Sequence, residues 1–176
     1  MKKVFLLIIT LVFIQCNDQK TKLVTKGKVG EITKTTTEQE LENIYKNDSI
    51  VKIPEASDYV NEYAIYEKGG KHLLSVFPKI PKDTINFIER VKVYSPMYKT
   101  EKGISTIATF SDISANYSIN KIDPTFTTAI VYIDELNGTF ALDKKDLGLD
   151  EFDLNKISKD QIPDMAKIKY ITIWFE

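Results

Sequence analysis

The sequence has few of the residues from which catalytic and metal sites are usually built. It holds one cysteine, Cys16, one histidine, His72, and one tryptophan. A cluster of histidine ligands is therefore excluded, and a Ser-His-Asp site would have to use His72 alone. The motifs G-x-S-x-G, G-x-x-x-x-G-K-[ST], G-x-G-x-x-G and H-E-x-x-H are also absent. We predict a protein that is not an enzyme, with no catalytic residues, no metal and no cofactor.

The sequence also lacks an excess of charge of either sign. Its 24 basic and 25 acidic residues give a formal net charge of -1. A protein that binds the phosphate backbone of nucleic acid needs a basic surplus, so nucleic acid is not an expected partner. The 176 residues are 43% hydrophobic and 28% charged, which is typical of one globular domain or two small ones.

Long hydrophobic runs are missing, apart from one short run at the N-terminus. Lys2 and Lys3 precede eleven uncharged residues, 4–14. A membrane-spanning helix needs about 20 apolar residues, so this run is too short to span, and its layout is typical of a secretory signal. We predict that residues 1–15 are a signal peptide that is removed. The polar stretch 16–28 is interpreted as a flexible tether.

Cys16 follows this run directly, in the sequence FIQC. That arrangement resembles the lipobox of bacterial lipoproteins, in the looser form found in the Bacteroidota. The resemblance implies that the Cys16 thiol is acylated, with palmitate or a similar chain, and anchors the protein in the outer membrane. The following residues, CNDQKTK, lack the acidic cluster of surface-exported lipoproteins in that group, which favours the periplasmic side. The alternative is an ordinary secretory signal with an incidental cysteine.

Two stretches of the sequence match one another at four positions. The matching residues are Thr37, Glu40, Leu41 and Tyr45 in the first stretch, and Thr109, Asp112, Ile113 and Tyr117 in the second. A threonine followed three residues later by an acid is typical of a capping box, and the two later residues lie on one face of a helix. Each stretch therefore predicts a short helix of about ten residues.

Segments that alternate between apolar and polar residues follow each expected helix. Four such segments lie at 49–53, 60–67, 71–77 and 85–94, and four more at 117–122, 127–136, 139–144 and 167–176. The dipeptides Gly69-Gly70 and Asn137-Gly138 predict tight hairpins, the second with a positive φ at both residues. We predict an α+β fold of two tandem repeats, each a helix plus a four-stranded antiparallel sheet, over 29–98 and 99–176. Ser158 to Asp164 predict an additional helical turn before the last strand.

The last segment is apolar on both faces. Alternation places Tyr170 and Trp174 on one face and Ile171 and Ile173 on the other. This pattern predicts a central strand, packed by a helix on one side and buried or binding a partner on the other.

The segment from Lys102 to Tyr117 resembles a repeat in uncharacterised small lipoproteins of the Bacteroidota. The architecture is distantly similar to the outer-membrane assembly lipoproteins and to tandem repeats of the β-lactamase-inhibitor type. Those families bind proteins, so the resemblance implies a protein-binding function.

The acidic residues give no pattern of a catalytic or metal site. Asp134 and Glu135 are expected on a strand, where neighbours point to opposite faces and cannot work as a pair. The acidic group 143–153 breaks the spacing of a calcium loop and is interpreted as a solvated loop. It contains Asp143, Asp146, Asp150, Glu151 and Asp153.

Tyrosines are plentiful, and tyrosine side chains are common anchors of protein interfaces. The predicted binding face contains Tyr59, Tyr63, Tyr66, Tyr94 and Tyr98. We predict a lipid-anchored envelope protein that acts as a non-catalytic protein-binding module, with an unidentified protein partner. One alternative is a periplasmic inhibitor or immunity protein against a toxin or hydrolase, and another is a carbohydrate-binding or carbohydrate-processing lipoprotein.

Overall fold

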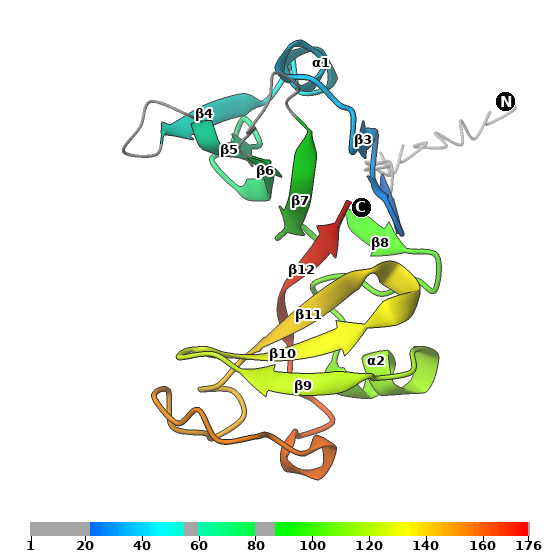
Figure 1. Cartoon of the computed structure of the whole chain (residues 1–176), viewed down its shortest axis with the longest axis vertical. Coiled ribbons are helices and arrows are strands. Elements are labelled where there is room, and N and C mark those ends of the chain that lie inside the picture. The colour runs from blue at the N-terminus through cyan, green and yellow to red at the C-terminus, as the bar shows by residue number, and fades with distance from the viewer. Residues whose placement is uncertain (1–21, 55–59, 80–86, 176) are drawn as a thin grey trace, which may run out of the picture.

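The computed structural model describes residues 22–54, 60–79 and 87–175 (Figure 1). The predicted signal peptide, Cys16 and Tyr59 lie outside the described residues. The described chain is mostly β-structure, with twelve strands, two short α-helices and two 3-10 turns.

Eight strands form one large antiparallel sheet, in the order β4-β5-β6-β7-β12-β11-β10-β9. The strands are β4 (Ser49–Pro54), β5 (Val60–Tyr66), β6 (His72–Pro78), β7 (Ile88–Val93), β12 (Ile168–Trp174), β11 (Gly138–Asp143), β10 (Thr128–Ile133) and β9 (Lys121–Pro124). The last strand, β12, is central, as its apolar faces predicted. It pairs with β7 on one side and β11 on the other.

A second, small sheet has the order β3-β2-β1-β8. Its strands are β1 (Lys22–Thr25), β2 (Lys28–Val29), β3 (Ile32–Thr33) and β8 (Tyr98–Thr100). Strand β1 pairs in parallel with β8, which joins the start of the described chain to its middle. The tether predicted over 16–28 is therefore too long, because the chain already belongs to a sheet from Lys22 onward.

Both predicted helix starts are confirmed. Helix α1 (Glu38–Ile44) begins after Thr37, whose backbone N–H donates to Glu40 Oε2 at 2.7 Å. Helix α2 (Phe110–Asn116) begins after Thr109, which donates to Asp112 Oδ2 at 2.8 Å. Each helix has seven residues instead of about ten, because both end at the tyrosine that closes the matching stretch.

The 3-10 turns are η1 (Asp134–Leu136) and η2 (Lys159–Gln161). The second confirms the helical turn expected near Ser158, which makes its own capping box with Gln161. The first replaces the tight hairpin expected at Asn137-Gly138. Asn137 alone has a positive φ of 45°, and Gly138 is already the first residue of β11.

The predicted fold class, two tandem helix-plus-sheet repeats, is wrong. Strands β7 and β12 pair directly, with Val91 opposite Ile173, so the two groups of four strands belong to one sheet. The small sheet adds a layer that the prediction lacked altogether. The alternation of apolar and polar residues identifies a strand, but it does not specify which neighbour the strand pairs with.

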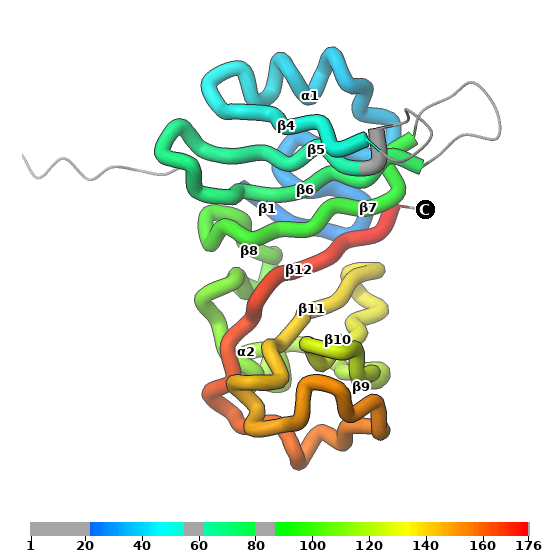
Figure 2. The backbone as a smooth tube through the Cα atoms, turned by 90° about the vertical axis from the view of Figure 1, so that its left-hand side faces the viewer, coloured from blue at the N-terminus to red at the C-terminus, as the bar shows by residue number. Residues whose placement is uncertain are grey.

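One face of the large sheet carries the core. Leu74, Val91 and Ile171 lie on this face and belong to the same buried cluster as Leu41 of α1 and Ile113 of α2. The small sheet adds Val24, Val29 and Ile32 to that cluster. Figure 2 shows β1 of the small sheet behind the strands of the large sheet.

Candidate binding face of the large sheet

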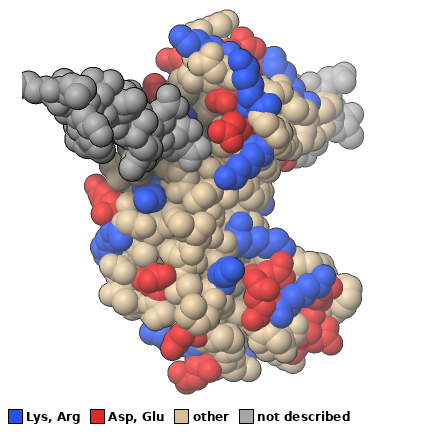
Figure 3. Space-filling model, turned by 180° about the vertical axis from the view of Figure 1, so that it is seen from behind, with Lys and Arg blue, Asp and Glu red and all other residues tan. Residues whose placement is uncertain are grey.

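The other face of the large sheet carries no helix or strand among the described elements, and it faces the viewer in Figure 2. We call it the open face. The strand registers place on it the large side chains of Val51, Ile53, Glu62, Tyr66, His72, Phe77, Arg90, Lys92, Tyr94, Lys121, Asp123, Ile130, Tyr132, Tyr170 and Trp174, among others. Figure 3 views this face edge-on and shows a hollow in the outline of the molecule on that side. The sheet therefore bends toward its open face.

Small residues form the floor of the open face. They are almost completely buried although no element covers them, and they are Ala64, Ser75, Thr139, Ala141 and Thr172. Because the sheet is bent, the long side chains of neighbouring strands converge above these positions. The open face is thus a shallow hollow with a floor of small residues and walls of aromatic and charged side chains, most of the charged ones being cationic near β7.

Three residue types that occur once in the sequence lie together on this face. The only arginine, Arg90 on β7, is directly opposite the only tryptophan, Trp174 on β12. The only histidine, His72, lies on β6 next to β7. Arginine and tryptophan are the residues most enriched in the energetic centres of protein interfaces, together with tyrosine. The sequence prediction missed Arg90, although its rarity and its place in an alternating segment could have identified it.

Four aromatic rings form a row across the open face. The ring centroids of Tyr66 and His72 are 4.6 Å apart, and those of His72 and Tyr94 are 4.2 Å apart, both nearly parallel. Tyr170 continues the row at 5.8 Å from Tyr94. An irregularity in the β5–β6 register places His72 directly opposite Tyr66 and so permits the first stack.

His72 also contacts a serine, in an arrangement that superficially resembles part of a hydrolase site. Its Nε2 lies 3.0 Å from Ser75 Oγ, and burial lowers the pKa of the imidazole. Ser75 is completely buried in the floor, so no substrate carbonyl can reach its hydroxyl. The contact therefore holds the imidazole between the two tyrosine rings.

Two cations lie beside this aromatic row. The Arg90 guanidinium carbon is 4.3 Å from the centre of the Phe77 ring, and Arg90 Nη1 bonds to Glu89 at 2.5 Å. Lys92 Nζ lies between two rings, 5.5 Å from Phe77 and 5.1 Å from Tyr170. Burial lowers the pKa of Lys92, and the nearby charge of Arg90 adds to this effect.

A pocket of about 210 Å³ opens at one side of this face, and Trp174 and Tyr132 line it. Asp134 and Asn137 supply polar groups at its edge. The Asn137 side-chain amide is already used, because it donates to the Trp174 carbonyl at 3.1 Å. The indole of Trp174 therefore contributes an apolar wall to the pocket.

The structure separates the tyrosines that were predicted to form one binding face. Tyr66 and Tyr94 lie on the open face, whereas Tyr63 and Tyr98 are core residues. The Tyr63 hydroxyl donates to Glu38 at 2.9 Å. Burial raises the pKa of Tyr63 to about 12. Burial also raises the pKa of Tyr98 to about 12. The predicted set missed Tyr170, which completes the aromatic row.

The acidic residues are used in local contacts. Asp134 and Glu135 lie in the turn η1, not on a strand as predicted. Asp134 accepts a hydrogen bond from Asn120 Nδ2 at 2.8 Å, and Glu135 forms an ion pair with Lys102 at 2.6 Å. In the acidic loop, the buried Lys144 ammonium donates to the backbone carbonyls of Glu151 and Asp153. Across the described ranges, no three His, Cys, Asp or Glu side chains are grouped as a metal site would require.

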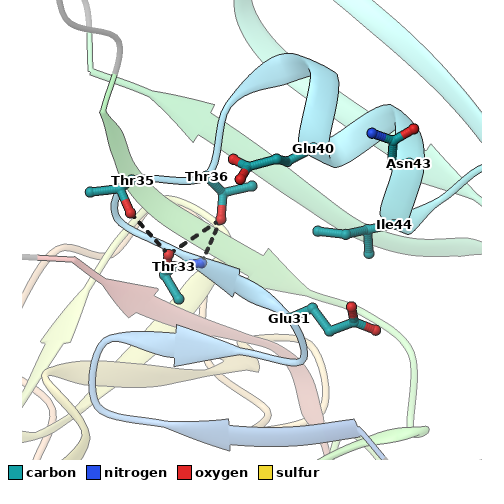
Figure 4. A pocket seen from close by; sticks show the side chains of 7 residues that line it. All are labelled: Glu31, Thr33, Thr35, Thr36, Glu40, Asn43 and Ile44. Atoms are coloured by element: carbon teal, nitrogen blue, oxygen red, sulfur yellow. Dashed lines mark hydrogen bonds between the residues drawn. The ribbon is translucent and has the colours of Figure 1, made fainter.

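A second, polar pocket lies at the start of α1 and is shown in Figure 4. Its lining residues are Glu31, Thr33, Thr35, Thr36, Glu40, Asn43 and Ile44. The Thr36 hydroxyl accepts from the Thr33 backbone N–H at 2.8 Å, and Glu40 caps the helix. Because these groups already serve the local fold, the open face is the stronger candidate site.

Comparison with known proteins shows a likeness to a solved structure. No family model matches the chain, and no curated protein matches it. Among solved structures, the crystal structure of the uncharacterized protein YfeY from Escherichia coli is similar, with a TM-score of 0.56 and 18% sequence identity. The match covers 89% of this chain and 100% of that one. At this identity the likeness concerns the fold alone.

Proposed function

We propose that this protein is a lipid-anchored envelope protein that binds a partner protein through the open face and catalyses no reaction. The observation that carries the proposal is the gathering of Arg90, Trp174 and four stacked or tilted aromatic rings on one uncovered sheet face. Rigid aromatic side chains and arginine provide most of the binding energy in protein interfaces. Eight strands at a spacing of about 4.8 Å give a face about 34 Å wide, which is wide enough for an interface of ordinary size.

The proposed anchor is compatible with this use of the sheet. Five residues, 17–21, separate Cys16 from β1, so the anchor point is at most about 20 Å from Lys22 by chain length. Strand β1 lies in the small sheet, behind the large one and away from the open face. A chain tethered there leaves the open face accessible to a partner. No helix among the described residues is long and apolar enough to cross a membrane.

Chemical crosslinking in intact membranes tests the proposed binding, with mass spectrometry of the captured proteins. Two variants are compared with the wild-type protein: Trp174→Ser on the open face, and Leu23→Ser at an exposed position of the small sheet. We expect a specific partner to be captured by the wild type and by Leu23→Ser, and to be lost with Trp174→Ser. Thermal unfolding of the purified variants controls for folding. Capture of the same proteins by all three forms would contradict the proposal.

The proposed anchor is tested separately with Cys16→Ser. The wild-type protein is expected to fractionate with membranes and to enter the detergent phase, and Cys16→Ser is expected to remain in the aqueous phase. Intact mass spectrometry checks for the acyl chain directly. A wild-type protein that carries no lipid would contradict the anchor and leave the binding proposal standing.

A periplasmic inhibitor or immunity protein would use the same face on a different partner. Growth of a deletion strain distinguishes the two: envelope defects in monoculture indicate a housekeeping partner, and sensitivity confined to co-culture with a competitor indicates immunity.

A further inference from the structure

We infer that the segment bound by the open face is acidic, with a carboxylate held between Arg90 and Lys92 and a large apolar side chain in the pocket beside Trp174. This inference rests on the proposed function and specifies the chemistry of the partner. It follows from the half-buried position of the Lys92 ammonium, from the N–H donors of Arg90 that Glu89 leaves unused and from the position of the pocket.

Lys92 is a half-buried cation that lacks a carboxylate partner within the described residues. The other lysines in the strands of the large sheet are paired: Lys52 with Glu38, Lys121 with Asp123 at 2.6 Å and Lys169 with Asp143 at 2.7 Å. In the described part of the chain, no carboxylate oxygen lies within 4.0 Å of the Lys92 ammonium. Partial burial of an ammonium group costs free energy that a bound carboxylate recovers. The aromatic rings on both sides hold this ammonium in place.

Arg90 supplies a second set of donors two residues along the same strand and on the same face. Its guanidinium is fixed over Phe77, and Glu89 bonds to only one of its nitrogens, Nη1. A guanidinium has five N–H donors, so most of them are available to a ligand carboxylate. Glu62 also lies on the open face, and its charge only partly opposes the lowering of the pKa of His72 and of Lys92 that burial causes. It is not within ion-pair distance of either, so it does not occupy the site.

The pocket fixes where an apolar side chain would enter. Trp174 and Tyr132 line it, on β12 and β10, and the pocket therefore lies above β11, two strands from Lys92. Two strand spacings are about 10 Å, which equals about three residues of an extended chain. The face is thus suited to an acidic residue and a large apolar residue about three positions apart.

Trp174 provides a direct reporter for a test, because it is the only tryptophan and it lines the pocket. The full-length protein in detergent is titrated with an acetylated peptide of three Asp-Gly-Ser-Phe repeats. A matched peptide carries Asn in place of Asp, and another carries Ala in place of Phe. We expect the first peptide to change the Trp174 fluorescence, and each substituted peptide to bind about ten-fold more weakly. The binding of the Asp peptide is also expected to weaken as salt is raised.

Variants identify the cations responsible. Arg90→Gln and Lys92→Gln are each expected to weaken binding of the Asp peptide about ten-fold and to leave the Asn peptide unaffected. Lys99→Gln on β8, in the small sheet, removes the same charge at a distance and is expected to have no effect. Equal affinity for the Asp and Asn peptides, or unchanged binding after Arg90→Gln and Lys92→Gln, would overturn the inference. The crosslinking experiment in membranes then separates the two claims. If Trp174→Ser still abolishes capture of the partner, the proposed function stands and only the acidic chemistry of the partner is wrong. If Trp174→Ser captures the same partner as the wild type, both the proposed function and this inference are wrong.

Discussion

Arg90 and Trp174 face one another across the β7–β12 pair, in the middle of an eight-stranded sheet. This pair joins two groups of four strands into one curved surface, and it places an arginine and an indole on the two central strands of the sheet, at the end of β12. The core elements all pack on the opposite side. The binding proposal therefore concerns the one broad surface that the fold leaves without a covering element in the described chain.

Gly138 is expected to be essential for the close approach of β11 and β12. A Cβ atom at this position would lie 2.6 Å from the Thr172 carbonyl oxygen and 2.7 Å from Ile173 Cδ1. We predict that Gly138→Ala lowers the free energy of unfolding by about 1–3 kcal/mol, because the strands must separate. Gly69→Ala is the matched control, since nothing lies within 4 Å of the added Cβ. Urea denaturation of both variants measures the difference, and equal stability would contradict the packing described.

The buried hydroxyl pair of Tyr45 and Tyr98 ties α1 to the small sheet. The two oxygens are 2.9 Å apart, and burial raises the pKa of both phenols. Tyr45→Phe or Tyr98→Phe leaves one buried hydroxyl without its partner, so each is expected to cost about 1–3 kcal/mol. The double variant is expected to cost less than the sum of the two, because no unpaired hydroxyl remains. Additive effects in a double-mutant cycle would be inconsistent with this contact.

Lys144 is expected to organise the acidic loop. Its buried ammonium donates to the carbonyls of Glu151 and Asp153, which fold the loop back onto the end of β11. We predict that Lys144→Met increases proteolytic cleavage between residues 146 and 156 without unfolding the sheet. Lys145→Met is the control, because Lys145 is exposed and pairs with Glu151 at the surface. A cleavage pattern that is the same for both variants would exclude this organising contact.

The capping box of α2 gives stability a defined dependence on pH. Hydrogen bonds from the Thr109 backbone and side chain lower the pKa of Asp112. Because the folded pKa is depressed, this contribution is fully present above the unfolded pKa and is lost as pH falls through the folded value. We therefore predict that Asp112→Asn is less stable than wild type at pH 7, and that the difference shrinks toward pH 3. Urea denaturation at the two pH values tests this, and a constant difference would be evidence against the charged cap.

The sequence predicted local elements better than their assembly. Thr37 and Thr109 mark real helix starts, because a capping box depends only on residues three positions apart. The pairing of β7 with β12 depends on residues about 80 positions apart, such as Val91 and Ile173, and alternation cannot select that partner. The small sheet was missed because β2 and β3 have only two residues each, which is too short for any periodic pattern.

The candidate site was predictable in part. Tyr63 and Tyr66 are three residues apart, so alternation along β5 already places them on opposite faces. The prediction grouped them by proximity in sequence and so mixed a core residue with a surface one. Tyr170 and Trp174 were correctly placed on one face of a central strand. Their neighbours Arg90 and His72 come from other strands, and only the sheet order brings them together.

Position-specific photocrosslinking in growing cells tests the central claim most directly. A photoreactive amino acid is introduced at Ile130, on the open face, and in parallel at Ala115, on the exposed side of α2. The binding proposal predicts a discrete crosslinked partner from Ile130 and none from Ala115. The same partner crosslinked only from Ala115, or no crosslink from Ile130 in folded protein, would contradict it.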